Sequence, residues 1–276
     1  MEILSPNRMS RIRQTFNNLQ IEGRKGFIPF VTAGDPDLET SLSIILKLAD
    51  LGADVIELGV PFSDPMADGP TIQRSSQRTL ENGTCLADVL KLASEFRQYS
   101  DVPLVLFSYF NPILRFGIDK FQNAASDAGI DGLLLTDVIE DEAVVISKKL
   151  ASCDIDLISL IAPTTTDARI KTISDNARGF IYAVSRAGVT GAQESTSDAA
   201  KKLVHRLRQY TDLPIAVGFG ISTATQIADV WRYADAVVVG SAIVAEIEKA
   251  VTSGDAVSRI ERFVGQLLPL VCKKGE

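Results

Sequence analysis

The chain has 276 residues, of which 46% are hydrophobic and 23% are charged, a composition typical of a globular protein with material for a sizeable core. Its net charge of −7 and pI near 4.9 argue against a sequence-independent nucleic-acid binder, although backbone N–H groups can still hold an anionic ligand. No run of about 18 apolar residues occurs and the first residues lack an apolar signal core, so we expect a cytoplasmic protein that makes no use of a membrane.

Short apolar runs alternate with longer amphipathic segments along the whole chain. The runs are GFIPFVT from Gly26, DVIELGV from Asp54, PLVLFSY from Pro103, GLLLTDV from Gly132, IDLISLIAP from Ile155, GFIYAVS from Gly179, LPIAVGFG from Leu213 and DAVVVG from Asp235. Between them, segments such as LETSLSIILKLADLGA carry apolar residues at helical spacing, namely Leu42, Ile45, Leu46 and Ala49. Apolar strands separated by helices predict a parallel sheet that is buried on both faces. Eight such units favour a closed (β/α)8 barrel over an open doubly wound sheet, and no GxGxxG follows the first strand.

Two further helical segments lie outside these units. One is near SPNRMSRIRQTFNNL and the other runs from about Asp255 to Val271. The sequence contains no linker, repeat or low-complexity tract that would divide it. We therefore predict a single domain over residues 1–276, an α/β barrel with extra N- and C-terminal helices.

The cysteine and histidine content argues against several kinds of site. Cys85, Cys153 and Cys272 are odd in number and widely spaced, which predicts reduced thiols and neither a disulfide framework nor a zinc site. The single histidine, His205, lies in a cation-rich helical segment where a structural role is expected. Histidine-built metal sites and Ser–His–Asp triads are therefore not expected, and we predict no metal.

A carboxylate interrupts the second apolar run. Strand alternation puts Val55, Glu57 and Gly59 on one face of DVIELGV and only apolar residues on the other, so Glu57 is expected to point into the barrel. The structural alternative is a buried ion pair, but no basic residue lies nearby in the sequence. Burial without a partner raises the pKa of a carboxyl toward neutrality, where it can give and take a proton.

The loop VPFSDPMADGP supplies two more carboxylates, Asp64 and Asp68. Aspartate is common in turns, and Gly69-Pro70 is typical of a helix start where a carboxylate offsets the helix dipole, so structural and catalytic roles are equally open from spacing alone. Two acids whose environments push their pKa values apart form a recognised acid–base arrangement.

Glycine-bearing turns follow the last three predicted strands. They are SRAGVTG ending at Gly191, VGFGIS around Gly220 and VVVGSAIV around Gly240-Ser241, and we expect Ser222 and Ser241 to cap the helices that follow. Free N–H groups at helix N-termini bind phosphate, and barrels place such a site after strands seven and eight. The three turns together indicate a phosphate site.

Six segments, in chain order and over essentially the full length, resemble the hallmarks of the tryptophan synthase alpha subunit family: PFVTAGDP, ELGVPFSDPMADGPTIQ, YFNP, SRAGVTG, VGFGIS and VVVGSAIV. The resemblance implies a TIM-barrel lyase that cleaves indole-3-glycerol phosphate into indole and glyceraldehyde 3-phosphate in tryptophan biosynthesis. It also implies an α2β2 complex in which indole passes through a tunnel to a β subunit. Pyridoxal phosphate belongs to that subunit, so no cofactor is expected in this chain.

Matching motif positions imply roles for individual residues. Glu57 corresponds to the family's catalytic glutamate, Asp68 to its catalytic aspartate and Tyr182 to a tyrosine near the glutamate. In the implied retro-aldol reaction, Glu57 protonates C3 of the indole ring and removes a proton from the adjacent hydroxyl. Ionised Asp68 accepts the hydrogen bond of the indole N–H and offsets the positive charge.

The remaining matches describe substrate contacts. The phosphate positions are Gly191, Gly220, Gly240 and Ser241. The indole pocket falls on Phe30, Leu134 and Phe219, for which plain barrel core is the alternative. Thr190 falls in a mobile loop that closes over substrate.

One segment departs from the family pattern. Where the family usually reads DLPxEE, this chain has DVIEDE from Asp137, with Ile139 in place of the proline. The region lies near the β-subunit interface of the family, so the detail of partner coupling is affected and the cleavage residues are not. Asp137 itself matches and is expected to make a substrate-side or loop contact.

Other functions remain open from sequence alone. A free-standing indole-3-glycerol phosphate lyase without a β partner would share the catalytic residues. A catalytically silent alpha chain acting as a binding partner is disfavoured by the presence of both Glu57 and Asp68. A phosphosugar isomerase on the same barrel would be expected to use a His or Lys at a strand end, and His205 is misplaced for that role.

Overall fold

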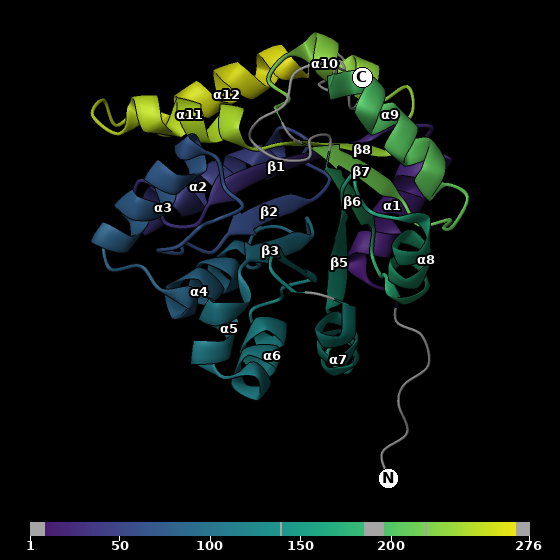
Figure 1. Cartoon of the computed structure of the whole chain (residues 1–276). Coiled ribbons are helices and arrows are strands. Elements are labelled where there is room, and N and C mark those ends of the chain that lie inside the picture. Colours follow the sequence, from purple (N-terminus) through teal and green to yellow (C-terminus); the bar gives the residue numbers. More distant parts are fainter. Residues whose placement is uncertain (1–8, 139, 185–195, 219, 269–276) are drawn as a thin grey trace.

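Eight parallel strands pair in chain order and close into a barrel, because β1 pairs with β8 as well as with β2 (Figure 1). The computed structural model describes residues 9–138, 140–184, 196–218 and 220–268. The strands are β1 (Gly26–Thr32), β2 (Ile56–Gly59), β3 (Leu104–Ser108), β4 (Gly132–Leu135), β5 (Asp156–Ile161), β6 (Ile181–Val184), β7 (Ile215–Gly218) and β8 (Ala236–Val239). Each lies within one of the predicted apolar runs, and the predicted (β/α)8 barrel is confirmed.

Helices cover the outside of the barrel (Figure 1). They are α1 (Arg11–Ile21), α2 (Leu38–Asp50), α3 (Pro70–Glu81), α4 (Leu86–Phe96), α5 (Phe110–Phe116), α6 (Ile118–Asp127), α7 (Glu140–Ala151), α8 (Asp167–Asn176), α9 (Thr196–Leu207), α10 (Ala224–Val230), α11 (Ser241–Ala250) and α12 (Ala256–Leu267). The two extra helices predicted at the ends are α1 and α12. The last residues of the predicted C-terminal segment, 269–271, lie outside the described residues.

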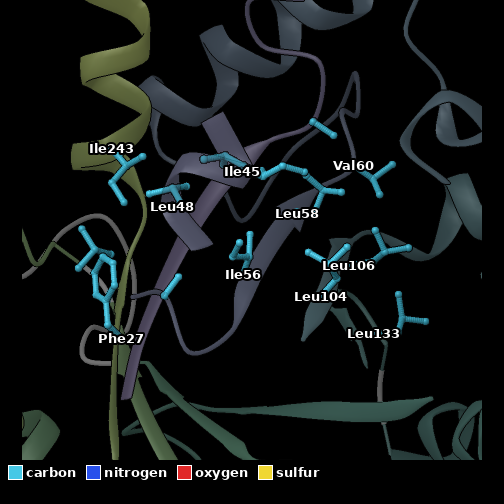
Figure 2. Close-up of a cluster of buried hydrophobic side chains, with 14 of the residues drawn as sticks. Phe27, Ile45, Leu48, Ile56, Leu58, Val60, Leu104, Leu106, Leu133 and Ile243 are labelled. Atoms are coloured by element: carbon cyan, nitrogen blue, oxygen red, sulfur yellow. The ribbon is translucent and has the colours of Figure 1, made fainter. Parts of the chain in front are cut away.

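Two apolar cores follow from the alternation of side chains along the strands. The outer core lies between strands and helices and includes Ile56, Leu58 and Val60 of the β2 region, as Figure 2 shows. The inner core fills the barrel and includes Val55. The predicted division of this segment into a helix-facing set and a barrel-facing set is therefore confirmed.

Helix α1 closes the N-terminal end of the barrel. Its buried side chains, Ile12, Phe16 and Leu19, belong to the inner core, and the rings of Phe16 and Phe180 lie 5.6 Å apart. This end is thus filled with apolar side chains, and open space is left to the other end.

Aspartates just before β2, β4 and β8 link each of these strands to the preceding strand at the N-terminal end of the barrel. Each aspartate carboxylate accepts a backbone N–H from the start of the preceding strand at 2.8–2.9 Å: Asp54 from Phe27, Asp131 from Leu104 and Asp235 from Ile215. Each also pairs with an arginine, respectively Arg24, Arg97 and Arg208. These contacts fix strand register at the base of the barrel.

The remaining predictions about single residues are answered by exposure. His205 is exposed on α9, as expected for a structural position. Cys85 is exposed and Cys153 is partly buried, and both are free thiols, whereas Cys272 lies outside the described residues. Among the described residues, the longest apolar helices fall short of what crossing a membrane requires.

Candidate active site

A cavity of about 250 Å³ opens at the C-terminal ends of the strands. Its lining combines residues from the loops after β2, β7 and β8 with side chains of the strands themselves. It brings together most of the predicted site residues: Phe30, Glu57, Asp68, Tyr182, Gly220, Gly240 and Ser241. Residues separated by more than 200 positions in the sequence therefore share one space.

Glu57 points into this cavity from β2. It is 1% exposed, and its Oε1 atom has no hydrogen-bond partner among the described residues. Burial alone raises the pKa of Glu57 to about 8. The predicted inward orientation is found, the described residues that line the cavity include no basic side chain, and this carboxyl holds its proton at neutral pH.

Tyr182 of β6 lies beside Glu57 because the neighbouring strand leaves room for its ring. A Cβ atom on Gly218 of β7 would lie 2.2 Å from the Tyr182 hydroxyl oxygen, so only glycine fits there. Burial, and then the charge of Glu57, raise the pKa of Tyr182 well above its usual value. The phenol is thus an uncharged hydrogen-bonding group close to the Glu57 carboxyl.

Asp68 approaches the cavity from the β2–α3 loop and is held there by a tyrosine. The Tyr109 hydroxyl donates to Asp68 Oδ2 at 3.2 Å and accepts the Ala67 backbone N–H at 2.9 Å. Burial raises the pKa of Asp68 to about 6, and the hydrogen bond from Tyr109 opposes that rise. Asp68 is thus partly desolvated, and its pKa stays below that of Glu57. Between about pH 6 and 8, Glu57 carries a proton while Asp68 is ionised.

Tyr109 was not predicted as a site residue. It belongs to the YFNP segment, directly after β3, and is 3% exposed. Its contact with Asp68 joins residues 41 positions apart, so the only sequence signal was a tyrosine at the C-terminal end of a strand. Asp64, the other carboxylate of the loop, is exposed and accepts a hydrogen bond from its neighbour Ser63, as the structural alternative predicts.

Another part of the cavity lining is formed by the start of α11. Gly240 is the N-cap and Ser241 is the first helical residue, and both line the cavity. The first N–H groups of an α-helix lack intrahelical partners and carry partial positive charge, which suits an anion. Gly220, also in the lining, has φ +72°, a left-handed conformation that favours glycine.

The predicted helix caps are each wrong by one residue. Gly240, and not Ser241, is the N-cap of α11. For α10 the N-cap is Thr223, and not Ser222, because the Thr223 side chain binds the backbone of Gln226 and the Gln226 side chain returns to the backbone of Thr223. Both helices still begin where the anion site was predicted.

Aromatic and aliphatic side chains form the wall between the two ends. Phe30 packs edge-on against Phe107 with ring centroids 5.4 Å apart, and it covers Gly59, where a Cβ would lie 2.6 Å from its ring. Further wall residues that the sequence analysis missed are Ile72, Phe107, Leu160, Val184 and Val238. Alternation with helix-facing neighbours could have indicated the four that lie on strands, whereas Ile72 lies on α3.

Two predicted site residues lie outside the cavity lining and follow the alternatives named for them, namely barrel core for Leu134 and a loop contact for Asp137. Leu134 is fully buried in the inner core and does not belong to the cavity lining. Asp137 is exposed, and its carboxylate accepts the backbone N–H of Phe110 at 2.8 Å, at the first residue of α5. Thr190, Gly191 and Phe219 lie outside the described residues.

The titratable groups of the cavity do not form a cation site. In the described part of the chain, no three His, Cys, Asp or Glu side chains gather in a way that could hold a metal ion. The arrangement instead offers a neutral acid, an ionised carboxylate, an apolar wall and a helix N-terminus.

Comparisons with known proteins agree with this geometry. The sequence profile of the tryptophan synthase alpha chain family matches residues 16–269. The chain is similar to the tryptophan synthase alpha chain of a Thermoanaerobacter species, with 44% identity over 94% of this chain and 98% of that one. To that of Citrifermentans bemidjiense the identity is 49%, over 87% and 90% of the two chains.

Solved structures give the same result. The tryptophan synthase subunit alpha of Legionella pneumophila superposes with a TM-score of 0.88 at 34% identity, covering 97% of this chain and 100% of that chain. The aminoacrylate-bound tryptophan synthase of M. tuberculosis gives a TM-score of 0.84 at 33% identity, covering 94% and 98%.

We predict that Glu57→Gln raises thermal stability at pH 8 and leaves it almost unchanged at pH 4. Folding raises the pKa of this carboxyl from 4.5 to about 8, so the folded state binds more protons and stability falls as the pH rises through that interval. A neutral amide removes this cost, with a gain of about 1–3 kcal/mol at pH 8. Thermal denaturation at both pH values measures it. The exposed Glu81→Gln is the matched control, and an equal gain there would contradict the assignment.

We also predict that Gly218→Ala lowers stability by about 1–3 kcal/mol, because the added methyl group collides with the Tyr182 hydroxyl and the packed core cannot yield. Gly265→Ala is the control. Gly265 lies in exposed α12 with open space around it, so alanine there should stabilise by up to about 1 kcal/mol. Urea denaturation midpoints compare the two, and equal midpoints would contradict the close approach at Gly218.

Proposed function

The chain belongs to the tryptophan synthase alpha chain family, and from this premise we propose the roles that its cavity residues play in the reaction. As a member of that family it is a lyase that cleaves indole-3-glycerol phosphate into indole and glyceraldehyde 3-phosphate in tryptophan biosynthesis. The observation that carries the residue assignment is Glu57, a carboxyl buried in an apolar cavity whose described lining contains no cation.

Glu57 performs both proton transfers of the retro-aldol step. Its neutral carboxyl gives a proton to C3 of the indole ring, which places a positive charge on the indolenine nitrogen. The carboxylate so formed takes the proton of the hydroxyl on the adjacent side-chain carbon. That O–H electron pair forms the aldehyde C=O, and the C–C bond electrons return to the ring to give indole. Each such transfer contributes typically about 10²–10⁴ in rate.

Asp68 stabilises the charge that develops on the ring. Its carboxylate is ionised above about pH 6 and accepts the hydrogen bond of the ring N–H. Tyr109 holds it in place, and this support matters because Asp68 sits on a loop. Tyr182, uncharged and next to Glu57, provides a polar neighbour for the carboxylate that forms after the first proton transfer.

The phosphate binds where the loops after β7 and β8 line the cavity. Gly220, Gly240 and Ser241 offer backbone N–H groups there, and we include Gly191 from the family match although it lies outside the described residues. Arg and Lys are absent from the described lining, so an anion is held by helix N–H groups.

The indole ring then lies against the apolar wall near Phe30. For Phe219 and Thr190, which lie outside the described residues, the proposed roles are a ring contact and loop closure. We place Leu134 behind the wall, where it supports the pocket from the inner core.

The family implies a β-subunit partner, and pyridoxal phosphate is carried by that subunit. We propose an α2β2 assembly in the cytoplasm, with no cofactor in this chain. Exposed apolar residues at the C-terminal end of the barrel support docking there: Met66, in the Asp68 loop, is 86% exposed and Leu114 on α5 is 53% exposed. Asp137 binds the first residue of the same helix, and we propose that the departing DVIEDE segment, whose Ile139 lies outside the described residues, adjoins this surface.

We propose further that residues 1–276 form one domain. The pairing of β1 with β8 supports this, since the first and last strands of the chain are neighbours. Helix α12 supports it too, because it packs on α11 and α2.

We expect the full chain to release indole from indole-3-glycerol phosphate, and Glu57→Gln to reduce that rate by at least about a hundredfold while the phosphate end still binds. Indole formation is measured with and without a β subunit. Near-wild-type cleavage by Glu57→Gln would reject the proton-transfer assignment. Full speed of the isolated wild-type chain would favour a free-standing lyase.

We expect Ser241→Asp to raise KM by roughly tenfold or more through repulsion of the substrate phosphate, with a smaller effect on kcat. Thr166→Asp is the control, since it places the same charge at the N-cap of α8, which lies outside the cavity lining. Steady-state kinetics separate the two constants, and an unchanged KM for Ser241→Asp would contradict the phosphate position.

A further inference from the structure

A network of charged side chains beside the cavity takes no part in the chemistry described above. Arg78 on α3 donates from Nε and Nη2 to the Asp35 carboxylate at 3.0 and 2.9 Å. Its Nη1 atom donates to Glu248 on α11 at 2.9 Å. Arg74, one turn earlier on α3, donates to both carboxylate oxygens of Glu248 at 2.7 and 2.8 Å, and Ser75 donates to Asp35 at 2.7 Å. One guanidinium, that of Arg78, thus bridges carboxylates from two different segments.

The network joins three segments that follow neighbouring strands. Asp35 lies just after β1, α3 follows the β2 loop and α11 follows β8, and β8, β1 and β2 are adjacent in the barrel. Helices α3 and α11 also pack against each other. The network therefore ties together the C-terminal ends of three strands.

Both bridged helices begin at the cavity. Helix α3 starts at Pro70, two residues after Asp68, and α11 starts at Ser241. Glu248 lies about two turns from Ser241, and Arg74 about one turn from the start of α3. Because helices are stiff over two turns, the contact between Glu248 and the arginines sets the separation of the two helix starts.

We propose that Glu248 and Arg78 are positioning residues, which fix the distance between the Asp68 carboxylate and the anion-binding start of α11. The inference rests on the proposed function, since one substrate must reach both places. The substrate carries its ring at one end and its phosphate at the other. It reacts well only if the distance between Asp68 and the start of α11 matches the distance between these two groups. Displacement by about 1 Å can cost about a hundredfold in rate.

The variant has to loosen this contact without stranding a buried charge. The Asp35 side chain is fully buried and depends on Arg78, so removing Arg78 threatens folding. Glu248→Gln leaves the Arg78–Asp35 pair intact and weakens only the link to α11. Arg78→Lys is a second variant, because a single ammonium group cannot hold both carboxylates in the fork geometry of a guanidinium.

The same helix supplies a matched control. Glu246 pairs with Lys249 and with Arg259 of α12 at 2.6 and 3.4 Å, and its side chain is as buried as that of Glu248, with 18% against 28% exposed. Glu246→Gln therefore removes an equal charge from α11 on the side that faces away from α3.

For the full chain we expect Glu248→Gln to lower kcat by about tenfold and Arg78→Lys to fall between that variant and the wild type. Affinity for inorganic phosphate, measured by calorimetric titration, should change by less than about twofold, because the start of α11 itself is intact. Glu246→Gln should leave kcat and phosphate affinity unchanged. The double variant Arg74→Gln/Glu248→Gln should lose no more than Glu248→Gln alone, since both changes break the same contact.

Wild-type kcat and KM in Glu248→Gln would overturn the proposal. An equal loss of kcat in Glu246→Gln, or a parallel loss of phosphate affinity, would show that α11 is merely destabilised and would also overturn it. If the wild-type chain itself releases no indole, the proposed function fails instead, and the two failures are thereby distinguished.

Discussion

The burial of one carboxyl group inside the barrel constrains everything around it. Glu57 is 1% exposed and burial raises its pKa to about 8, and the described residues that line the cavity include no cation that would hold it ionised. Keeping a proton on this group at neutral pH costs folding free energy that an ordinary core residue would not cost. The apolar wall of the cavity gives Glu57 surroundings of low polarity. Glycines at positions 59 and 218 leave space for the rings of Phe30 and Tyr182.

Asp68 and Glu57 carry the same functional group, and their pKa values differ because their burial and hydrogen bonding differ. Asp68 is partly buried on a loop, and its hydrogen bond with Tyr109 lowers the pKa that burial raises. The pKa values of about 8 and about 6 follow from two degrees of burial of similar groups. A retro-aldol cleavage that needs one protonated acid and one anion therefore has both in the same pH interval.

Local pattern was sufficient for the barrel and for the direction of Glu57. Each strand is a short apolar run, and a period of two fixes which side chains face inward, so β2 could be oriented from its sequence.

Contacts between distant segments could not be derived in this way. Tyr109 reaches Asp68 across 41 positions, and Arg78 reaches Glu248 across 170, and neither spacing has a local signature. The helix caps were misplaced by one residue because a serine was taken as the cap in each case, whereas the folded backbone selects Thr223 beside Ser222 for α10 and the glycine before Ser241 for α11. The family match placed Leu134 in the pocket, and it lies in the inner core, the alternative left open from the sequence, because a motif match does not give the depth of a residue in the barrel.

The aspartates before β2, β4 and β8 give this arrangement its mechanical basis. Each aspartate links two neighbouring strands at the N-terminal end of the barrel and pairs with an arginine. Helix α1 covers the same end, away from the cavity. The contacts that fix the strands thus lie at the N-terminal end of the barrel, and the cavity lies at the C-terminal end. The loops at the C-terminal end can therefore vary in sequence while the aspartate and arginine contacts at the other end keep the strands in register.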